Sequence, residues 1–277
     1  MFKKYGIIGL ILIAFVELNF ILKIQPFADN YFPIVWFGYI LVVDALVYRL
    51  KNKSLISNKP KLFFSLIVLS AVFWWTFELF NKGISLFHGS PYWAYHNATI
   101  DIFSTIPFST VLPAVFETAE LLSTIHLFDK VKLKKEHKIN KSLLIAMTWI
   151  GIAFLVVPFI IESPYLGQAM WFGFFFLLDP FNYMHNKPSI IGHLKDRNLL
   201  IPISLFIGGM VCGFFWEFWN YWAIPKWIYT MNPPFLGIRL FEMPLSGYIM
   251  YGPFAWSLYA AYNFIRTILH GKLEKVI

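Results

Sequence analysis

The chain has little charge and almost no cysteine. Only 14% of its 277 residues are Asp, Glu, Lys or Arg, whereas 58% are hydrophobic and the mean hydropathy is +0.61. This balance excludes a soluble single domain and is typical of a protein with several membrane-spanning segments. The single cysteine, Cys212, excludes an intramolecular disulfide and a cysteine-based metal cluster.

The sequence motifs of several enzyme classes are also missing. The chain contains neither a glycine-rich phosphate loop nor a nucleophile elbow. No pair of its 7 histidines has the spacing of a zinc site with a third ligand nearby. We therefore expect neither a metal nor an organic cofactor.

Long apolar segments make up most of the chain, and eight of them can cross a bilayer about 30 Å thick. The sequence thus predicts an all-α polytopic membrane helix bundle with about eight transmembrane helices. We expect the longest outer connections, 82–99 and 224–244, to fold back on the outer surface. The predicted spans lie near residues 5–23, 32–50, 62–81, 100–127, 142–161, 168–185, 199–223 and 245–268.

The basic residues indicate the orientation of these spans. If the N-terminus lies inside, all but four of the 23 Lys and Arg fall on inner segments, and the exceptions are Lys23, Lys82, Lys226 and Arg239. The positive-inside rule therefore predicts a plasma-membrane protein with both termini in the cytoplasm. Because this placement accounts for the net charge of +8, no nucleic-acid partner is expected.

Polar residues inside the apolar segments occur in pairs, one in each half of the chain. A charged side chain at the bilayer centre costs about 2.5–3.5 kcal/mol or more, so its presence in both halves favours a function. Four helices per half return the chain to the same side, which predicts two parallel four-helix repeats, 1–135 and 136–277. The matched pairs are Trp36 and Trp171, Asp44 and Asp179, Glu78 and Glu217, and Asn81 and Asn220.

Glu217 and Asn220 lie near the outer end of a predicted helix, three residues apart, so they share one helical face. A carboxyl kept from water by aromatic neighbours can remain protonated near neutral pH and act as an acid. Glu78 and Asn81 repeat the pattern in the first half. The structural alternative is a set of hydrogen-bonded helix ends that lock the two halves together.

Three further carboxyls are candidates for a role. Asp44 and Asp179 could meet between the halves, where they would share a proton, bind a cation or cap backbone groups; we favour a structural role for Asp44 and a functional one for Asp179. Glu242 lies where a helix dipole favours a carboxylate, and it could flank one cavity with Glu217. Glu117 has Ser257 as its counterpart in the second half.

The second half resembles the membrane-integral lycopene cyclase domain, an internally duplicated helical unit. The family places an acidic residue late in a helix, then a Trp-x-Tyr turn, a glycine and a proline-linked glutamate motif. Its motif has proline before two adjacent glutamates, whereas this chain has one glutamate followed by Met and Pro, and four helices per half exceed the family's three. The residues that carry the resemblance are Glu217, Trp227 to Tyr229, Gly237, Glu242, Met243 and Pro244.

The resemblance implies a membrane isoprenoid or polyene cyclase, or a similar isomerase, acting on an apolar lipid. Membrane-bound meroterpenoid cyclases are similar in using paired acids. Glu217, held by Asn220, would be the general acid, with Glu242 as base or cation stabiliser and Asp179 as a further catalytic candidate. The aromatic rings of the first four of the expected substrate-binding residues would stabilise a cation. These residues are Trp216, Trp219, Trp227, Tyr229, Glu78, Asn81 and Asp44.

Two other functions fit the sequence. A proton- or ion-coupled small-solute transporter would use Asp44 and Asp179 together and would depend on an ion gradient. A lipid-binding membrane protein without turnover would tolerate an amide in place of every acid.

Overall fold

The computed structural model describes residues 2–97, 100–135, 138–163, 166–167, 169–230, 238–269, 274 and 276. Its first part contains α1 (Lys4–Leu22), α2 (Tyr31–Lys51), α3 (Leu55–Asn58), α4 (Pro60–His88), β1 (Trp93–His96), η1 (Ile102–Ser104), α5 (Thr105–Phe108) and α6 (Val111–Thr124). Its second part contains α7 (Lys141–Ile160), α8 (Ala169–Met184), α9 (Ile190–Lys195), α10 (Leu200–Trp222), β2 (Lys226–Tyr229), β3 (Arg239–Leu240), β4 (Met243–Pro244), α11 (Leu245–Tyr248) and α12 (Tyr251–Ile268). The molecule is mostly helical, as the composition predicts.

Local sequence signals fix several helix ends. Pro60 stands at the start of α4, where its missing N–H costs nothing, and Gly89 ends the helix with a φ of +79°. The Asn140 side chain caps α7 by accepting a hydrogen bond from the Leu143 N–H. These signals agree with the apolar periodicity, so the long helices lie close to the predicted spans.

Six helical segments among the described residues are long and apolar enough to cross a membrane. They are α1, α2, α4, the stretch Ile102–Thr124 that contains η1, α5 and α6, α7, and α10. A bilayer-spanning helix needs about 20 apolar residues, and these segments provide that length.

The other two predicted spans, 168–185 and 245–268, correspond to shorter or more polar helices. α8 has 16 residues, and the last predicted span is divided into α11 and α12. α12 buries Tyr259, Tyr262 and Asn263 inside the bundle. Because a helix enclosed by other helices meets little lipid, it can carry more polar side chains than one that faces lipid.

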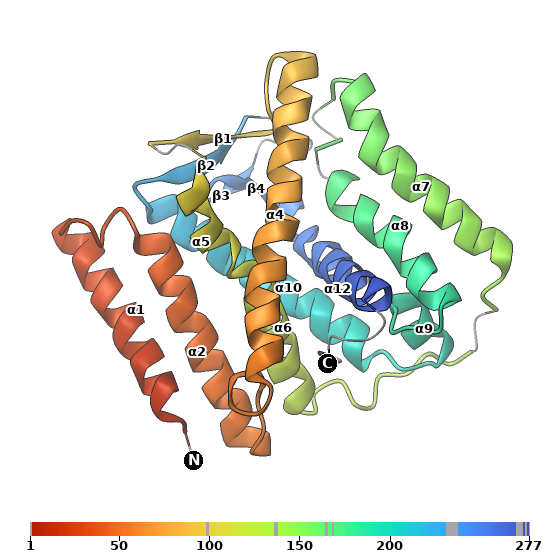
Figure 1. Ribbon diagram of the computed structural model, residues 1–277, viewed down its shortest axis with the longest axis horizontal. Helices are drawn as coiled ribbons and strands as arrows, with labels where there is room; N and C mark the ends of the chain where they lie inside the picture. Colours follow the sequence, from red (N-terminus) through yellow and green to blue (C-terminus); the bar gives the residue numbers. More distant parts are fainter. Residues whose placement is uncertain are drawn as a thin grey trace.

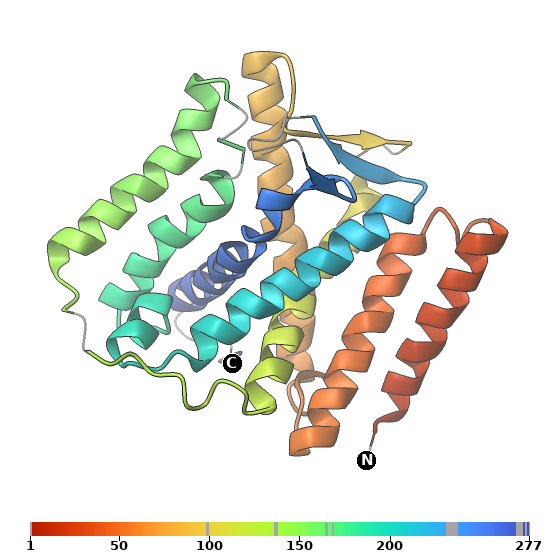
Figure 2. The same cartoon turned by 180° about the vertical axis from the view of Figure 1, so that it is seen from behind.

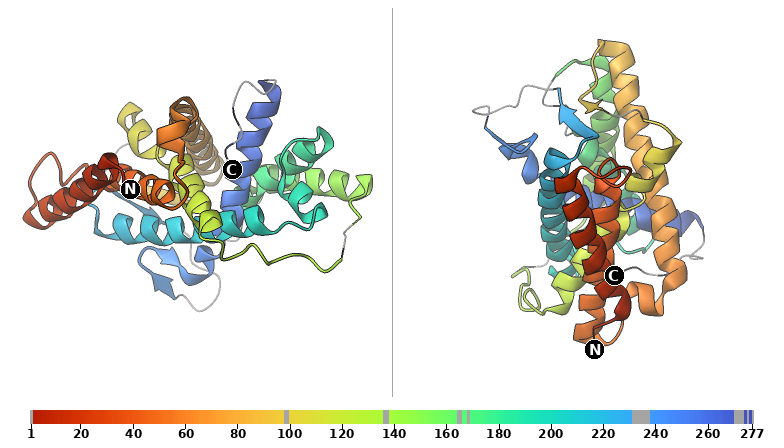
Figure 3. Two further views of the ribbon diagram at one scale, coloured as in Figure 1. Left: turned by 90° about the horizontal axis from the view of Figure 1, so that it is seen from below. Right: turned by 90° about the vertical axis from the view of Figure 1, so that its left-hand side faces the viewer.

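The helices form two lateral pairs around a central group (Figure 1). α1 packs on α2 and α7 packs on α8, and the view from below places these pairs at opposite ends of an elongated molecule (Figure 3). In each pair two glycines allow the backbones to approach closely. A Cβ on Gly9 would lie 2.6 Å from the Gly38 carbonyl oxygen, and one on Gly151 would lie 2.9 Å from that of Gly173.

The central group contains α4, α6, α10 and α12, with α10 in contact with both α6 and α12. Aromatic side chains join the first half to the second across it. Trp36 of α2 is fully buried, and its ring centroid lies 5.2 Å from that of Trp216 and 4.9 Å from that of Trp219, both on α10. Such aromatic contacts contribute about 0.5–1.5 kcal/mol beyond the area they bury.

The connections after α4 and after α10 pair with each other as strands, a pairing that the sequence did not predict. β1 runs antiparallel to β2, with Trp93 opposite Tyr229 and Tyr95 opposite Trp227. The reverse view shows this ribbon beside the end of α10 (Figure 2). Local sequence cannot reveal a backbone pairing between residues so far apart in the chain. The ribbon links the two halves at the ends of α4 and α10.

Candidate functional site

Glu78, in the C-terminal half of α4, accepts three hydrogen bonds from aromatic side chains. The indole N–H groups of Trp74 and Trp93 lie 3.0 and 3.2 Å from its Oε1, and the hydroxyl of Tyr95 lies 2.6 Å from the same atom. The Glu78 side chain is only 7% exposed. Two of its three partners, Trp93 and Tyr95, come from β1, so the ribbon completes this carboxyl site.

Glu217 of α10 has a similar environment. Its Oε1 accepts hydrogen bonds from the hydroxyls of Tyr229 on β2, at 2.8 Å, and Tyr251 on α12, at 2.5 Å. The indole N–H of Trp227 in turn donates to the Tyr229 hydroxyl at 3.3 Å. Glu217 is fully buried, and within the described part of the chain its Oε2 has no hydrogen-bond partner.

The side-chain amides of Asn81 and Asn220 bind the backbone of the segments that bring the aromatic partners to these carboxyls. The Asn220 amide donates to the Trp227 carbonyl at 2.9 Å and accepts from the Trp227 N–H at 2.9 Å. Asn81 donates to the Trp93 carbonyl at 2.8 Å and accepts from the Tyr92 N–H at 2.8 Å. The sequence predicts that Asn220 holds Glu217, but in the structure its amide binds the backbone of β2 instead.

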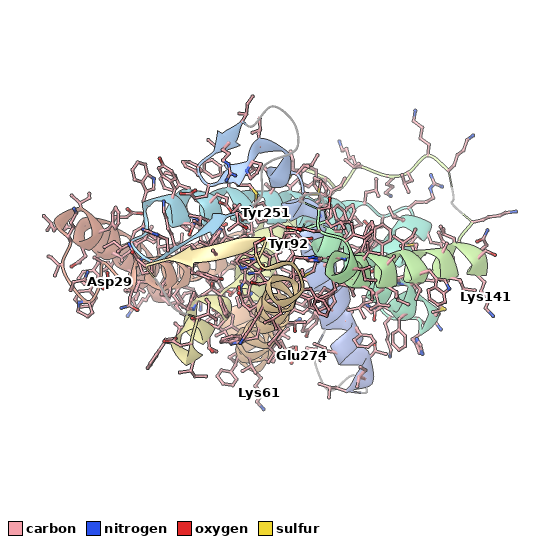
Figure 4. The ribbon with its side chains drawn as sticks, turned by 90° about the horizontal axis from the view of Figure 1, so that it is seen from above. Asp29, Lys61, Tyr92, Lys141, Tyr251 and Glu274 are labelled. Atoms are coloured by element: carbon pink, nitrogen blue, oxygen red, sulfur yellow. The ribbon has the colours of Figure 1, made fainter. Side chains whose placement is uncertain are left out.

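A cavity of about 260 Å³ lies beneath the ribbon and between the halves. The tyrosines that contact both carboxyls line it, whereas Glu78 and Glu217 lie behind them. The view from above places Tyr251 near the middle of the molecule and Asp29 toward one end (Figure 4). The residues that line the cavity include Asp29, Phe32, Trp74, Phe77, Trp93, Tyr95, Asp101, Phe103, Phe108, Trp171, Trp216, Lys226, Trp227, Tyr229 and Tyr251.

The phenol groups of the ribbon remain protonated over a wide pH range. Removal from water, followed by the negative charge of Glu78, raises the pKa of Tyr95 well above its ordinary value of 10.0. Removal from water and the Glu217 charge raise the pKa of Tyr229 in the same way. Both hydroxyls are therefore hydrogen-bond donors at neutral pH, which is how they contact the two carboxyls.

Glu242 lies outside the cavity lining, in the β3–β4 turn. Its Oε1 accepts from the Lys226 ammonium at 2.6 Å, and the Arg239 guanidinium donates to its backbone carbonyl at 2.8 Å. Lys226 does line the cavity, so Glu242 fixes a cation at its edge. The Glu242 carboxyl therefore contacts Lys226, which lines the cavity, but does not itself line the cavity.

Asp44 and Asp179 each bind the backbone of a short helix in their own half. Asp179 accepts from the Ile190 and Ile191 N–H groups at 2.8 and 2.9 Å, at the start of α9. Asp44 accepts from the Ile56 N–H of α3 at 2.8 Å and from the Tyr5 hydroxyl. Their hydrogen bonds within the described residues do not join the two aspartates, and both serve as helix caps.

The expected substrate-binding residues fall into two groups. Trp216, Trp227 and Tyr229 line the cavity. Trp219 instead stacks on Phe215, with 5.0 Å between ring centroids. The remaining expected residues, Glu78, Asn81 and Asp44, do not form the lining.

Several residues of this site were not predicted from the sequence. The Trp-x-Tyr of 93–95 follows Glu78 and Asn81 in the same order in which 227–229 follow Glu217 and Asn220, and this order was a usable signal. Tyr251 carried no comparable signal, because it comes from α12 across the bundle.

Gly237, part of the resemblance to lycopene cyclase domains, lies outside the described residues. Among the residues that are described, no three His, Cys, Asp or Glu side chains gather as a metal site would require. Comparison with known proteins adds no family, since no family model, no curated protein and no solved structure matches this chain.

Proposed function

We propose that the protein is an integral-membrane cyclase or isomerase of an isoprenoid or polyene lipid. The observation that carries this proposal is the aromatic cavity, where tyrosine hydroxyls bound to two buried glutamates meet an otherwise largely apolar wall. Apolar walls suit a hydrocarbon chain, and indole faces stabilise a passing carbocation. The chemistry requires only a proton donor and a proton acceptor.

In this proposal Glu217 is protonated when the substrate binds. The hydroxyl of Tyr229 or Tyr251 turns from Glu217 toward the substrate, gives up its proton and takes a proton from Glu217 in return. The proton adds to one carbon of a double bond, and the adjacent carbon becomes cationic. A second double bond attacks that carbon and closes a ring. Loss of a neighbouring proton to Glu78, through Tyr95, forms a new double bond, so the product is an isomer of the substrate.

The proposed architecture is a pair of parallel four-helix repeats with eight spans in the plasma membrane and cytoplasmic termini. Apart from the short elements η1, α5, β3, β4 and α11, the order α1–α2–α3–α4–β1–α6 is matched by α7–α8–α9–α10–β2–α12, which supports the repeat. Asp44 and Asp179 bind the start of α3 and of α9 alike. In parallel repeats, Glu78 and Glu217 open on the same side of the membrane.

The test is chromatography with mass spectrometry on apolar lipids from a host supplied with candidate polyenes. Wild type is compared with Glu217→Gln at matched expression, and Asp129→Asn, on an exposed inner segment, is the control. We expect a peak of unchanged mass and altered retention in wild type and control, reduced at least about 100-fold in Glu217→Gln, the usual size of a general-acid contribution. An unchanged peak in Glu217→Gln would contradict the assignment of the acid.

A further inference from the structure

A second carboxyl cluster lies on the inner side of the bundle, away from the cavity. Glu117 of α6 is fully buried, and neither of its carboxyl oxygens has a hydrogen-bond partner among the described residues. Asp44 lies on α2, which packs on α6, and it acts on Glu117 electrostatically together with Glu120 and Lys51. A buried carboxyl without a donor is costly if ionised, so this arrangement needs a chemical explanation.

The two carboxyls at the centre of this cluster are not equivalent. Asp44 receives hydrogen bonds from the Ile56 N–H and the Tyr5 hydroxyl, and this hydroxyl also lies 2.9 Å from the Ser57 hydroxyl. These donors suit an ionised carboxylate. Glu117 receives none, so the neutral acid form is the one its surroundings accommodate. One proton between the two carboxyls removes the repulsion that two adjacent buried charges would suffer.

We propose that Glu117 and Asp44 form a proton-binding pair in which Glu117 carries a proton that it shares with the Asp44 carboxylate. This site is independent of the cyclase chemistry proposed above.

The surroundings favour a proton over a metal cation. A cation would need several free oxygen ligands, but the Tyr5 hydroxyl and both Asp44 oxygens are already engaged in hydrogen bonds. The other ionisable groups nearby are Tyr39 of α2 and Cys212 of α10, both in contact with Thr118, and Tyr262 of α12, which contacts Phe116. None of these contacts adds a cation ligand next to Glu117.

The pair is one helical turn from the inner surface. Glu120 follows Glu117 by three residues, about 4.5 Å along the helix, and binds the partly exposed Lys51 at 2.5 Å. In the second half Ser257 occupies the position of Glu117, and its hydroxyl donates to the Trp171 carbonyl. The proton site therefore belongs to the first half alone, and the second half provides a matched control.

Carbodiimide labelling tests the proposal, because dicyclohexylcarbodiimide adds to protonated carboxyls in apolar surroundings. The full-length protein in membranes is treated across a range of pH and digested for peptide mass spectrometry. We expect an adduct on Glu117 that is lost in Glu117→Gln, with no adduct on the ion-paired Glu120. We expect Asp44→Asn to alter the pH profile of labelling and Asp179→Asn to leave it unchanged.

Two outcomes overturn the proposal. Protection of Glu117 by sodium, but not by choline at equal ionic strength, would identify a metal-cation site instead. Absence of the adduct, together with absence of a protonated carboxyl band from the infrared difference between wild type and Glu117→Gln, would show that Glu117 is ionised. The infrared measurement does not depend on access of the reagent, and a common elution volume for all variants shows that they are folded.

Discussion

At the scale of single residues, the carboxyls of this protein differ by the donors that reach them. Glu78 and Glu217 receive aromatic N–H and O–H groups, Asp179 receives backbone N–H groups, and Glu117 receives no donor from the described residues. Hydrogen bonding to a carboxylate favours its charged form, and burial opposes it. Similar residues in similar apolar segments therefore have different roles.

The two ribbon tyrosines make the protein sensitive to alkaline pH. The pKa of Tyr95 and of Tyr229 is raised well above 10.0 in the folded protein, whereas the unfolded chain ionises near 10. Their contribution to stability is thus complete below about pH 10 and is lost as pH rises further, by up to about 1.4 kcal/mol per pH unit for each group.

Chemical unfolding in detergent at about pH 9 and about pH 11 measures this loss of stability. We expect Tyr229→Phe to lose less stability than wild type between the two conditions, because the substituted ring cannot ionise. Phe103→Leu, which alters the cavity lining without an ionisable group, is the control. An equal loss in wild type and Tyr229→Phe would show that the Tyr229 pKa is not raised by folding.

At the scale of elements, the β1–β2 ribbon determines the geometry of the site. β1 brings Tyr95 to Glu78 and β2 brings Tyr229 to Glu217, while each strand is tied to its helix by an asparagine. The carboxyls alone were apparent from the sequence, because each interrupts an apolar segment. The side chains that donate hydrogen bonds to these carboxyls were not apparent, because strand pairing between distant connections leaves no local periodic signal.

Removal of an asparagine amide should detach its strand. In Asn220→Ala the partly buried Trp227 N–H and carbonyl lose their side-chain partner, and each group left unsatisfied costs up to about 1–3 kcal/mol. Because two groups lose their partner, we expect a loss of stability of up to about 2–6 kcal/mol and, because Tyr229 moves with the strand, a lower yield of product. Ser123→Ala removes a hydroxyl that binds only the Glu120 carbonyl of its own helix and should have little effect on yield.

Unfolding curves and the lipid assay, run on the same preparations, measure both effects. Asn81→Ala is the matched variant for the first half and should act on β1 in the same way. Full activity in Asn220→Ala would mean that the position of Tyr229 does not depend on this amide.

At the scale of the whole molecule, the proposed orientation follows from the basic residues and predicts which loops are exposed on each side. Lys134 lies on a proposed inner segment and Ser90 on a proposed outer connection. Cys212, the only natural cysteine, is fully buried and can be replaced by Ala to leave no background thiol.

A membrane-impermeant maleimide should label Ser90→Cys in intact cells, and Lys134→Cys only after the cells are opened, each in the Cys212→Ala background. The reverse pattern would invert the proposed topology and would place the cavity at the cytoplasmic surface. Labelling of both positions in intact cells would mean that the two segments lie on one side, which contradicts the parallel four-helix repeats.

The sequence by itself determined the helical, membrane-type character of the chain and the positions of its buried acids, because composition and apolar periodicity are local properties. Only the tertiary structure decided which groups meet, such as Tyr251 with Glu217 and Lys226 with Glu242. Each of these contacts joins residues from different elements, and their approach depends on helix packing and strand pairing. Those long-range contacts distinguish Glu217, which is hydrogen-bonded to tyrosines that line the cavity, from Asp179, which only caps a helix.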